Sequence, residues 1–210
     1  MEEAGRKKLR LRRQFLKSVY PALIKAGKIF GLKARVEVNI DRVTPTVSFY
    51  SLNMIANNGI ALNFEKFKGK KVLIVNTASN CGYTPQLSEL KSLHDLYKGR
   101  LEVVGFPSND FKEQEQGSDE QIANFCHGVF GIRFPLMKKS VVVKAPQQNE
   151  VFEWLTSKEK NGWNEREPEW NFSKYLVNED GVLTHYFGPG ISPVSARVMR
   201  AVKLTSHASA

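Results

Sequence analysis

Apolar and polar residues follow patterns typical of both strands and helices along most of the chain. Continuous apolar runs at residues 71–76 and 101–106 predict two buried central strands. Leucines spaced three residues apart predict a helix over residues 85–97, between those strands. Further helices are expected at residues 118–127, 148–158 and 193–203, and further strands at residues 48–52, 60–64, 140–144, 173–178 and 182–187. Strands that alternate with helices and end in a hairpin predict an α/β domain with a mixed sheet.

Residues 1–43 have a different pattern, which predicts a basic amphipathic arm ahead of a domain formed by residues 44–210. On a helical wheel, Lys17, Lys25 and Lys28 lie opposite a broad apolar face. That face consists of Phe15, Leu16, Val19, Tyr20, Leu23 and Phe30. Such a helix suits a membrane surface, where anionic lipids attract each cation by about 1 kcal/mol. The alternative is that this helix docks on the folded domain of the same chain.

The net charge of +10 is concentrated in this arm. Residues 1–35 hold 11 Lys or Arg and 2 Glu, a net charge of +9, which leaves +1 for the rest of the chain. A nucleic-acid-binding domain carries its basic residues on the folded surface, so we expect no nucleic-acid partner.

No run of the sequence approaches the roughly 20 apolar residues that span a bilayer. Lys25 and Lys28 interrupt the apolar stretch near the N-terminus, which argues against a secretory signal. The same interruptions argue against a twin-arginine export motif at Arg12-Arg13. We therefore expect a cytoplasmic protein, with peripheral membrane contact through residues 6–33 as an open alternative.

The two cysteines, Cys81 and Cys126, are too few for a disulfide-stapled secreted fold. They have no metal-ligand spacing with His94, His185 or His207, so we expect neither a metal nor another cofactor.

Cys81 directly follows a predicted buried strand and precedes a predicted helix. The N-terminus of a helix favours an anion, so we expect this thiol to ionise more readily than an ordinary cysteine. The thiolate is the nucleophilic form, which makes Cys81 a candidate catalytic residue. A thioredoxin-like C-x-x-C motif is excluded because residue 84 is Thr, and a peroxiredoxin-like T-x-x-C motif because residue 78 is Ala. A single cysteine of the peroxide-attacking type remains.

Three sequence segments, taken in their order along the chain, indicate more specifically which class of thiol enzyme this is. They are Val-Asn-Thr-Ala-Ser-Asn-Cys-Gly-Tyr-Thr at residues 75–84, Gly-Phe-Pro-Ser-Asn-Asp-Phe-Lys-Glu-Gln-Glu-Gln-Gly-Ser at 105–118 and Trp-Asn-Phe-Ser-Lys-Tyr-Leu-Val at 170–177. Together they resemble the signatures of the glutathione peroxidase family, and the resemblance runs from about residue 46 to residue 203. It implies a thioredoxin-like fold with a central mixed sheet flanked by helices. It also implies a peroxidase that reduces hydrogen peroxide and organic or lipid hydroperoxides.

The same resemblance implies a catalytic tetrad of Cys81, Gln114, Trp170 and Asn171. The two amides and the indole N–H are neutral donors that can stabilise a thiolate.

The loop around Gln114 departs from the family pattern. Asp110 stands where the family usually has Gln, Lys112 and Glu113 replace two glycines, and Gln116 replaces a Pro. These departures put the flexibility of the loop and the access of substrate in question. Ser108 stands where many relatives carry an additional cysteine.

Cys126 lies in a segment similar to the helix that holds the resolving cysteine in thioredoxin-dependent members of the family. In the implied cycle, a Cys81 sulfenic acid condenses with Cys126 to form a disulfide, which thioredoxin or glutathione then reduces. If Cys126 is instead a buried core thiol, glutathione would resolve Cys81 directly. Only 15 residues separate Trp154 from Trp170, which resembles the monomeric phospholipid-hydroperoxide type, so we expect a monomer or a weak dimer.

Two other function classes stay open at this point. A redox sensor or relay would pass the oxidation of Cys81 to a partner protein, by stoichiometric disulfide transfer instead of steady-state turnover. A non-catalytic membrane-binding module would have no need of the four tetrad residues together.

Overall fold

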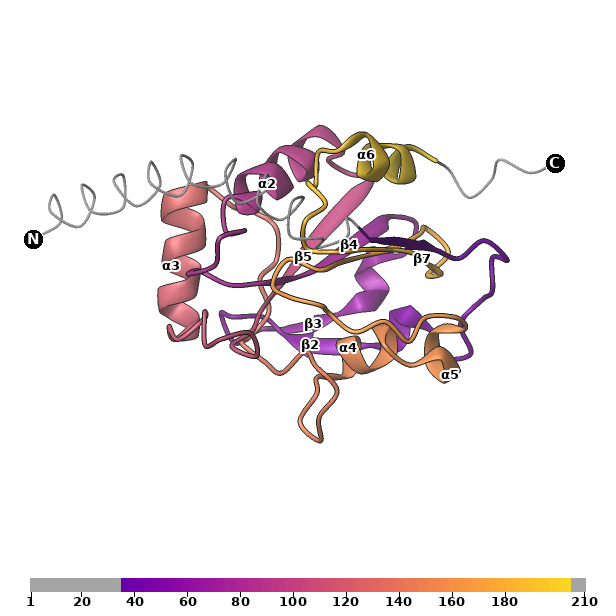
Figure 1. Cartoon of the computed structure of the whole chain (residues 1–210), viewed down its shortest axis with the longest axis horizontal. Coiled ribbons are helices and arrows are strands. Elements are labelled where there is room, and N and C mark those ends of the chain that lie inside the picture. The colour runs from indigo at the N-terminus through magenta and orange to yellow at the C-terminus, as the bar shows by residue number, and fades with distance from the viewer. Residues whose placement is uncertain (1–34, 205–210) are drawn as a thin grey trace, which may run out of the picture.

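The computed structural model describes residues 35–204. A five-stranded mixed sheet in the order β1-β7-β6-β4-β5 forms its centre, and β2 and β3 form a separate hairpin (Figure 1). The strands are β1 (Val36–Val38), β2 (Asn53–Ile55), β3 (Ala61–Asn63), β4 (Lys71–Thr77), β5 (Leu101–Pro107), β6 (Lys174–Val177) and β7 (Leu183–Phe187). The helices are η1 (Phe49–Ser51), η2 (Phe64–Phe67), α2 (Gln86–Leu96), α3 (Asp119–Phe130), α4 (Glu150–Leu155), α5 (Lys158–Asn161) and α6 (Ala196–Lys203). The predicted helix at residues 6–33 and His207 lie outside the described residues.

β4 is the strand around which the rest of the sheet is arranged. It runs parallel to β5 and antiparallel to β6, where Val75 pairs with Lys174. The carboxyl ends of β4 and β5 and the amino end of β6 therefore meet at one edge of the sheet. The segments that hold the predicted tetrad leave the sheet from this edge.

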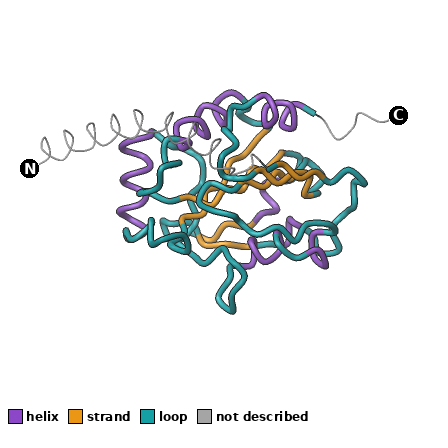
Figure 2. The backbone as a smooth tube through the Cα atoms, in the orientation of Figure 1, coloured by secondary structure: helices purple, strands orange, loops and turns teal. Residues whose placement is uncertain are grey.

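The side chains of β4 alternate between two hydrophobic clusters. Leu73 and Val75 pack into one cluster with apolar residues of α2, α3 and α6, and Val72 and Ile74 pack into the other with residues of α4. Figures 1 and 2 show α2 and α6 on one side of the sheet and α4, α5 and the hairpin on the other. All seven residues of β4 are buried, as the continuous apolar run predicts.

The strands and helices that border the predicted site are confirmed. The helices expected at 85–97, 118–127 and 193–203 correspond to α2, α3 and α6, and the strands expected at 71–76, 101–106, 173–178 and 182–187 to β4, β5, β6 and β7. Among residues 35–204 no helix is both long and apolar enough to cross a membrane.

The strand predicted at residues 48–52 is wrong, because this segment forms the short helix η1. Phe49 and Tyr50 are adjacent and both buried, whereas a strand would point neighbouring side chains to opposite faces. Ser48 caps the helix by accepting the N–H of Tyr50. The hairpin therefore begins only at Asn53, and its second strand ends where Asn63 caps η2.

Two further expectations are also wrong in detail. Residues 140–144 form a single isolated bridge instead of a strand, since the carboxylate of Asp110 accepts the N–H groups of Val142 and Val143 at 2.7 and 3.3 Å. The helix expected at 148–158 is divided into α4 and α5 by Thr156, whose side chain donates back to the carbonyl of Phe152. β1 was not predicted. It lies in residues assigned to the N-terminal arm and pairs with β7.

Candidate active site

Cys81 lies buried in the turn that leaves β4, with 3% of its surface exposed. Thr84 fixes this turn: its Oγ1 accepts the N–H of Cys81 at 3.0 Å and donates to the carbonyl of Ala78 at 2.8 Å. The N–H of Tyr83 donates to Sγ of Cys81 at 3.4 Å. α2 begins only at Gln86, so the nearest backbone donor to the thiol belongs to the turn and not to the helix.

Burial raises the pKa of the Cys81 thiol above its ordinary value. The N–H of Tyr83 opposes this effect, as do hydrogen bonds from the side chains of Trp170 and Asn171. The easier ionisation expected from a helix N-terminus is therefore wrong. The helix dipole acts mainly within the first turn, and four residues separate Cys81 from the first residue of α2.

Asn171 connects the thiol to Gln114. Its amide nitrogen donates to Oε1 of Gln114 at 2.9 Å, and its side chain is fully buried. Because the amide carries two protons, it can serve both Gln114 and Cys81. The structure thus brings the four predicted tetrad residues together, with Trp170 and Asn171 on the thiol and Gln114 on Asn171.

Asn76, near the end of β4, holds the Trp170–Asn171 segment in place. Its amide nitrogen donates to the carbonyl of Trp170 at 3.2 Å, and its Oδ1 accepts the N–H of Ser173 at 2.9 Å. The carbonyl of Asn76 also accepts the N–H of Phe172 at 2.7 Å. We did not predict this role. The signal in the sequence was a polar residue at the end of an apolar run. In the fold, this residue is fully buried.

The loop that carries Gln114 takes a left-handed turn at the two positions where the family usually has glycine. Lys112 and Glu113 both have φ of +51°. This conformation is uncommon for residues with a side chain, so the loop keeps a glycine-type backbone without glycine. Lys112 places its ammonium group 5.8 Å from the ring centre of Trp170, and Phe111 packs on the same ring at 5.5 Å.

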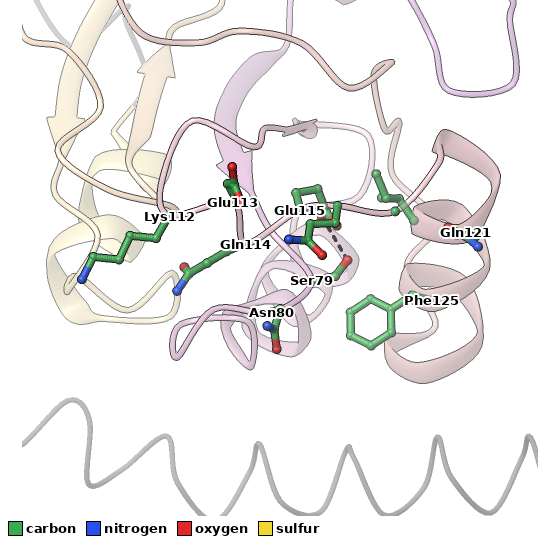
Figure 3. A pocket seen from close by; sticks show the side chains of 11 residues that line it. Ser79, Asn80, Lys112, Glu113, Gln114, Glu115, Gln121 and Phe125 are labelled. Atoms are coloured by element: carbon green, nitrogen blue, oxygen red, sulfur yellow. Dashed lines mark hydrogen bonds between the residues drawn. The ribbon is translucent and has the colours of Figure 1, made fainter.

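A pocket of about 570 Å³ opens beside the tetrad (Figure 3). It lies between the turn at Ser79 and Asn80, the loop at residues 112–117 and the first half of α3. Two of its lining residues are hydrogen-bonded to each other: the hydroxyl of Ser79 donates to the carboxylate of Glu115 at 2.9 Å (dashed line in Figure 3). Of the tetrad, Gln114 lines this pocket, so Cys81 lies next to it instead of within its wall.

Cys126 is a buried thiol on α3, in the same hydrophobic cluster as Cys81. Burial and the negative charge of Glu115 raise its pKa to about 12. Its carbonyl accepts the N–H of Ile132, next to Gly131, whose φ of +64° ends the helix. The neighbouring His127 is exposed, as expected of a surface histidine.

Within residues 35–204 no three His, Cys, Asp or Glu side chains gather in a way that could hold a metal ion. His94 instead contacts the carboxylate of Glu102 at 2.9 Å, and His185 stacks on Phe187.

Comparison with known proteins supports the family that the three sequence segments indicate. The glutathione peroxidase family model matches residues 49–156. The chain is 40% identical over 151 residues to glutathione peroxidase-like peroxiredoxin 2 of Saccharomyces cerevisiae, a match that covers 71% of this chain and 93% of the relative. It is 42% identical over 147 residues to the glutathione peroxidase homolog BsaA of Staphylococcus epidermidis, covering 70% and 92%.

Solved structures agree on the fold. The crystal structure of Trgpx in apo form matches with a TM-score of 0.58 and 29% identity, covering 76% of this chain and 98% of that one. A thioredoxin family thiol:disulfide interchange protein from Chlorobium tepidum matches with a TM-score of 0.54 at 15% identity, covering 76% and 96%, which confirms the thioredoxin-like fold. The site, the fold and the curated relatives agree: the chain belongs to the glutathione peroxidase family and is a peroxidase.

Proposed function

We propose that this peroxidase reduces hydroperoxides through a sulfenic acid on Cys81, that Cys126 resolves this acid as an intramolecular disulfide, and that a thioredoxin-like dithiol regenerates both thiols. The observation that carries the proposal is the set of neutral donors on the thiol. The side chains of Trp170 and Asn171 and the N–H of Tyr83 all favour the charged form of Cys81.

In the first step, the Cys81 thiolate attacks one oxygen of the hydroperoxide and the O–O bond breaks. The sulfur is oxidised to a sulfenic acid, and the other oxygen leaves as an alcohol or water after taking up a proton. A hydroperoxide in contact with the sulfur would also meet the donors that hold the thiolate, so these donors can stabilise the leaving oxyanion.

In the second step, the Cys126 thiol condenses with the Cys81 sulfenic acid, forming the S–S bond and releasing water. Both sulfurs belong to one hydrophobic cluster, which supports this pairing. Cys126 sits within the last two turns of α3, which also contain the exposed Gly128. Glycine in a helix is less stable than alanine by about 1 kcal/mol, so these turns can unwind to bring the sulfurs into contact.

In the third step, a dithiol protein reduces the disulfide by exchange and is itself oxidised to a disulfide. Glutathione is the alternative reductant, and it would require no Cys126.

Peroxidase assays on the full chain separate these possibilities. Wild type, Cys81→Ser and Cys126→Ser are compared with hydrogen peroxide and a lipid hydroperoxide, each with thioredoxin or with glutathione. We expect Cys81→Ser to be inactive with both reductants and Cys126→Ser to lose thioredoxin-driven turnover. Full turnover of Cys126→Ser with thioredoxin would contradict the role of Cys126, and activity in Cys81→Ser would contradict the proposal as a whole.

We also propose that the enzyme is cytoplasmic and that the basic segment at residues 6–33 brings it to anionic membrane surfaces. The charge of +9 in residues 1–35 supports this, since each cation adds about 1 kcal/mol of attraction. Deletion of residues 1–34 leaves β1 intact, because that strand begins at Val36. The truncated protein is expected to lose sedimentation with anionic liposomes and to keep its hydrogen peroxide turnover; unchanged sedimentation would contradict the proposal.

A further inference from the structure

Lys174 is a fully buried lysine at the start of β6, three residues after Asn171. A buried charge is unfavourable unless specific partners satisfy it. The Nζ atom of Lys174 has three such partners: the carbonyl of Phe172 at 2.6 Å, Oε1 of Gln86 at 2.8 Å and the carbonyl of Pro189 at 3.5 Å. The three protons of an ammonium group match these three acceptors.

The acceptors come from segments that border the thiol. Gln86 is the first residue of α2 and belongs to the segment that begins at Cys81. Phe172 directly follows Asn171, and its φ of +69° gives this segment a left-handed bend that the Lys174 contact stabilises. Pro189 lies in the loop between β7 and α6 and also accepts the amide of Gln86 at 2.7 Å.

We propose that Lys174 is a positioning residue for the peroxidase site. Its ammonium group ties the segment that holds Cys81 to the segment that holds Trp170 and Asn171, and so keeps the indole and amide donors directed at the sulfur. The inference rests on the proposed function of Cys81. Lys174 acts through the two segments and takes no part in the chemistry itself.

The charge state of Lys174 supports this role. Burial lowers its pKa to about 7, an effect that the carboxylate of Glu89 on α2 opposes. The other groups that face the ammonium from the elements around it, Gln86, Phe172 and Pro189, present neutral oxygens. As the pH rises through about 7, Lys174 loses a proton and can satisfy only two of the three acceptors. The reactivity of Cys81, normalised to its thiolate fraction, should therefore fall across that range.

Lys174→Met tests the inference, with Lys71→Met as a matched control. Lys71 is also a buried lysine of the central sheet, but it lies at the opposite end of β4 from Cys81 and pairs with Glu179. The rate constant for oxidation of Cys81 by hydrogen peroxide and its alkylation by iodoacetamide are measured as functions of pH. Thermal unfolding of each variant is recorded alongside.

We expect Lys174→Met to slow the oxidation of Cys81 by about tenfold or more, as small displacements of a reacting geometry do. Its alkylation curve should move to higher pH, and the change in normalised reactivity near pH 7 should disappear. Lys71→Met should lose thermal stability and keep the wild-type rate and pH profile.

The two measurements, oxidation by hydrogen peroxide and alkylation by iodoacetamide, test the proposed function and the positioning role separately. Failure of hydrogen peroxide to oxidise Cys81 in the wild type would overturn the proposed function. Identical alkylation profiles for wild type and Lys174→Met would overturn the positioning role, whatever the peroxide result. If Lys174→Met does not fold, Gln86→Met removes one of the three acceptors and is judged by the same two profiles.

Discussion

Asn171 donates its side-chain amide to Oε1 of Gln114 at 2.9 Å, across 57 residues of sequence. Gln114 orients the same amide that hydrogen-bonds the Cys81 thiol. Gln114 therefore influences the sulfur through Asn171, which is a more specific role than that of a separate donor. It also means that the loop at residues 108–117 and the segment before β6 must be in place together.

Gln114→Met should impair both stability and reaction. It leaves one amide proton of the fully buried Asn171 without its acceptor, at a cost of about 1–3 kcal/mol. The free amide can then turn away from Cys81, so we expect slower oxidation of the thiol. Urea denaturation and stopped-flow oxidation by hydrogen peroxide measure the two effects. Gln116→Met, on an exposed residue that lines the same pocket, is the control, and equal rates in the two variants would contradict this role.

The pH dependence of Cys81 alkylation reports on its donors. Because burial raises the thiol pKa, the rate should still be rising at pH 9.0, the ordinary value of this group. Trp170→Phe removes a donor that lowers the pKa, so its curve should move to higher pH. A plateau below pH 7 in the wild type would show an easily ionised thiol and contradict the structure.

Cys126 should resist alkylation in the reduced, folded protein. Both thiols are almost fully buried, but only Cys81 has hydrogen-bond donors that favour its thiolate, whereas Cys126, with a pKa near 12, remains a protonated thiol at pH 8. Mass spectrometry after short pulses of iodoacetamide should find Cys81 modified first, and Cys126 modified only after urea is added. Modification of both cysteines at one rate in native buffer would contradict this expectation.

The raised pKa of Cys126 also affects the free energy of unfolding in alkaline solution. The unfolded state releases the Cys126 proton at lower pH than the folded state does, so this group makes stability fall as the pH rises from 9.0 towards 12. Cys126→Val keeps the site apolar and removes that contribution. Its loss of stability over this range should therefore be smaller than that of the wild type, as measured by denaturation at several pH values.

The left-handed backbone at Glu113 restricts what can stand there. Glu113→Gly suits a φ of +51° and should leave Gln114 in place. Glu113→Val places a β-branched residue in that conformation, and we expect it to cost about 1–2 kcal/mol and to reduce the rate of Cys81 oxidation. Thermal unfolding and peroxide oxidation of both variants test this. Equal behaviour of the two would show that the loop does not depend on this conformation.

Much of the fold was predictable because the apolar runs of β4 and β5 and the leucine spacing of α2 are strong local signals. Residues whose conformation depends on distant partners were not predictable. The carboxylate of Asp110 takes the N–H groups that a strand at residues 140–144 would have used. Nothing local shows this, since the two segments lie about 30 residues apart.

The candidate site shows the same division. Cys81 was identified from its place between a predicted strand and a predicted helix, and the resemblance added Gln114, Trp170 and Asn171. The structure brings the four residues together. The spacing of the sequence could not show that the thiol is deeply buried and that α2 begins too late to offset this. Nor could it show that Asn76 and Lys174 hold the donors in place, because both contact segments distant in sequence.

The antiparallel pairing of β6 with β4 has a consequence for synthesis of the chain. Cys81 is made early, but the indole and amide that stabilise its thiolate are made about 90 residues later and reach it only when β6 joins the sheet. Contacts between such distant residues form late because loop closure precedes them. A chain still emerging from the ribosome would thus carry an ordinary thiol at Cys81. The arrangement of donors around Cys81 would therefore be complete only once β6 has joined the sheet.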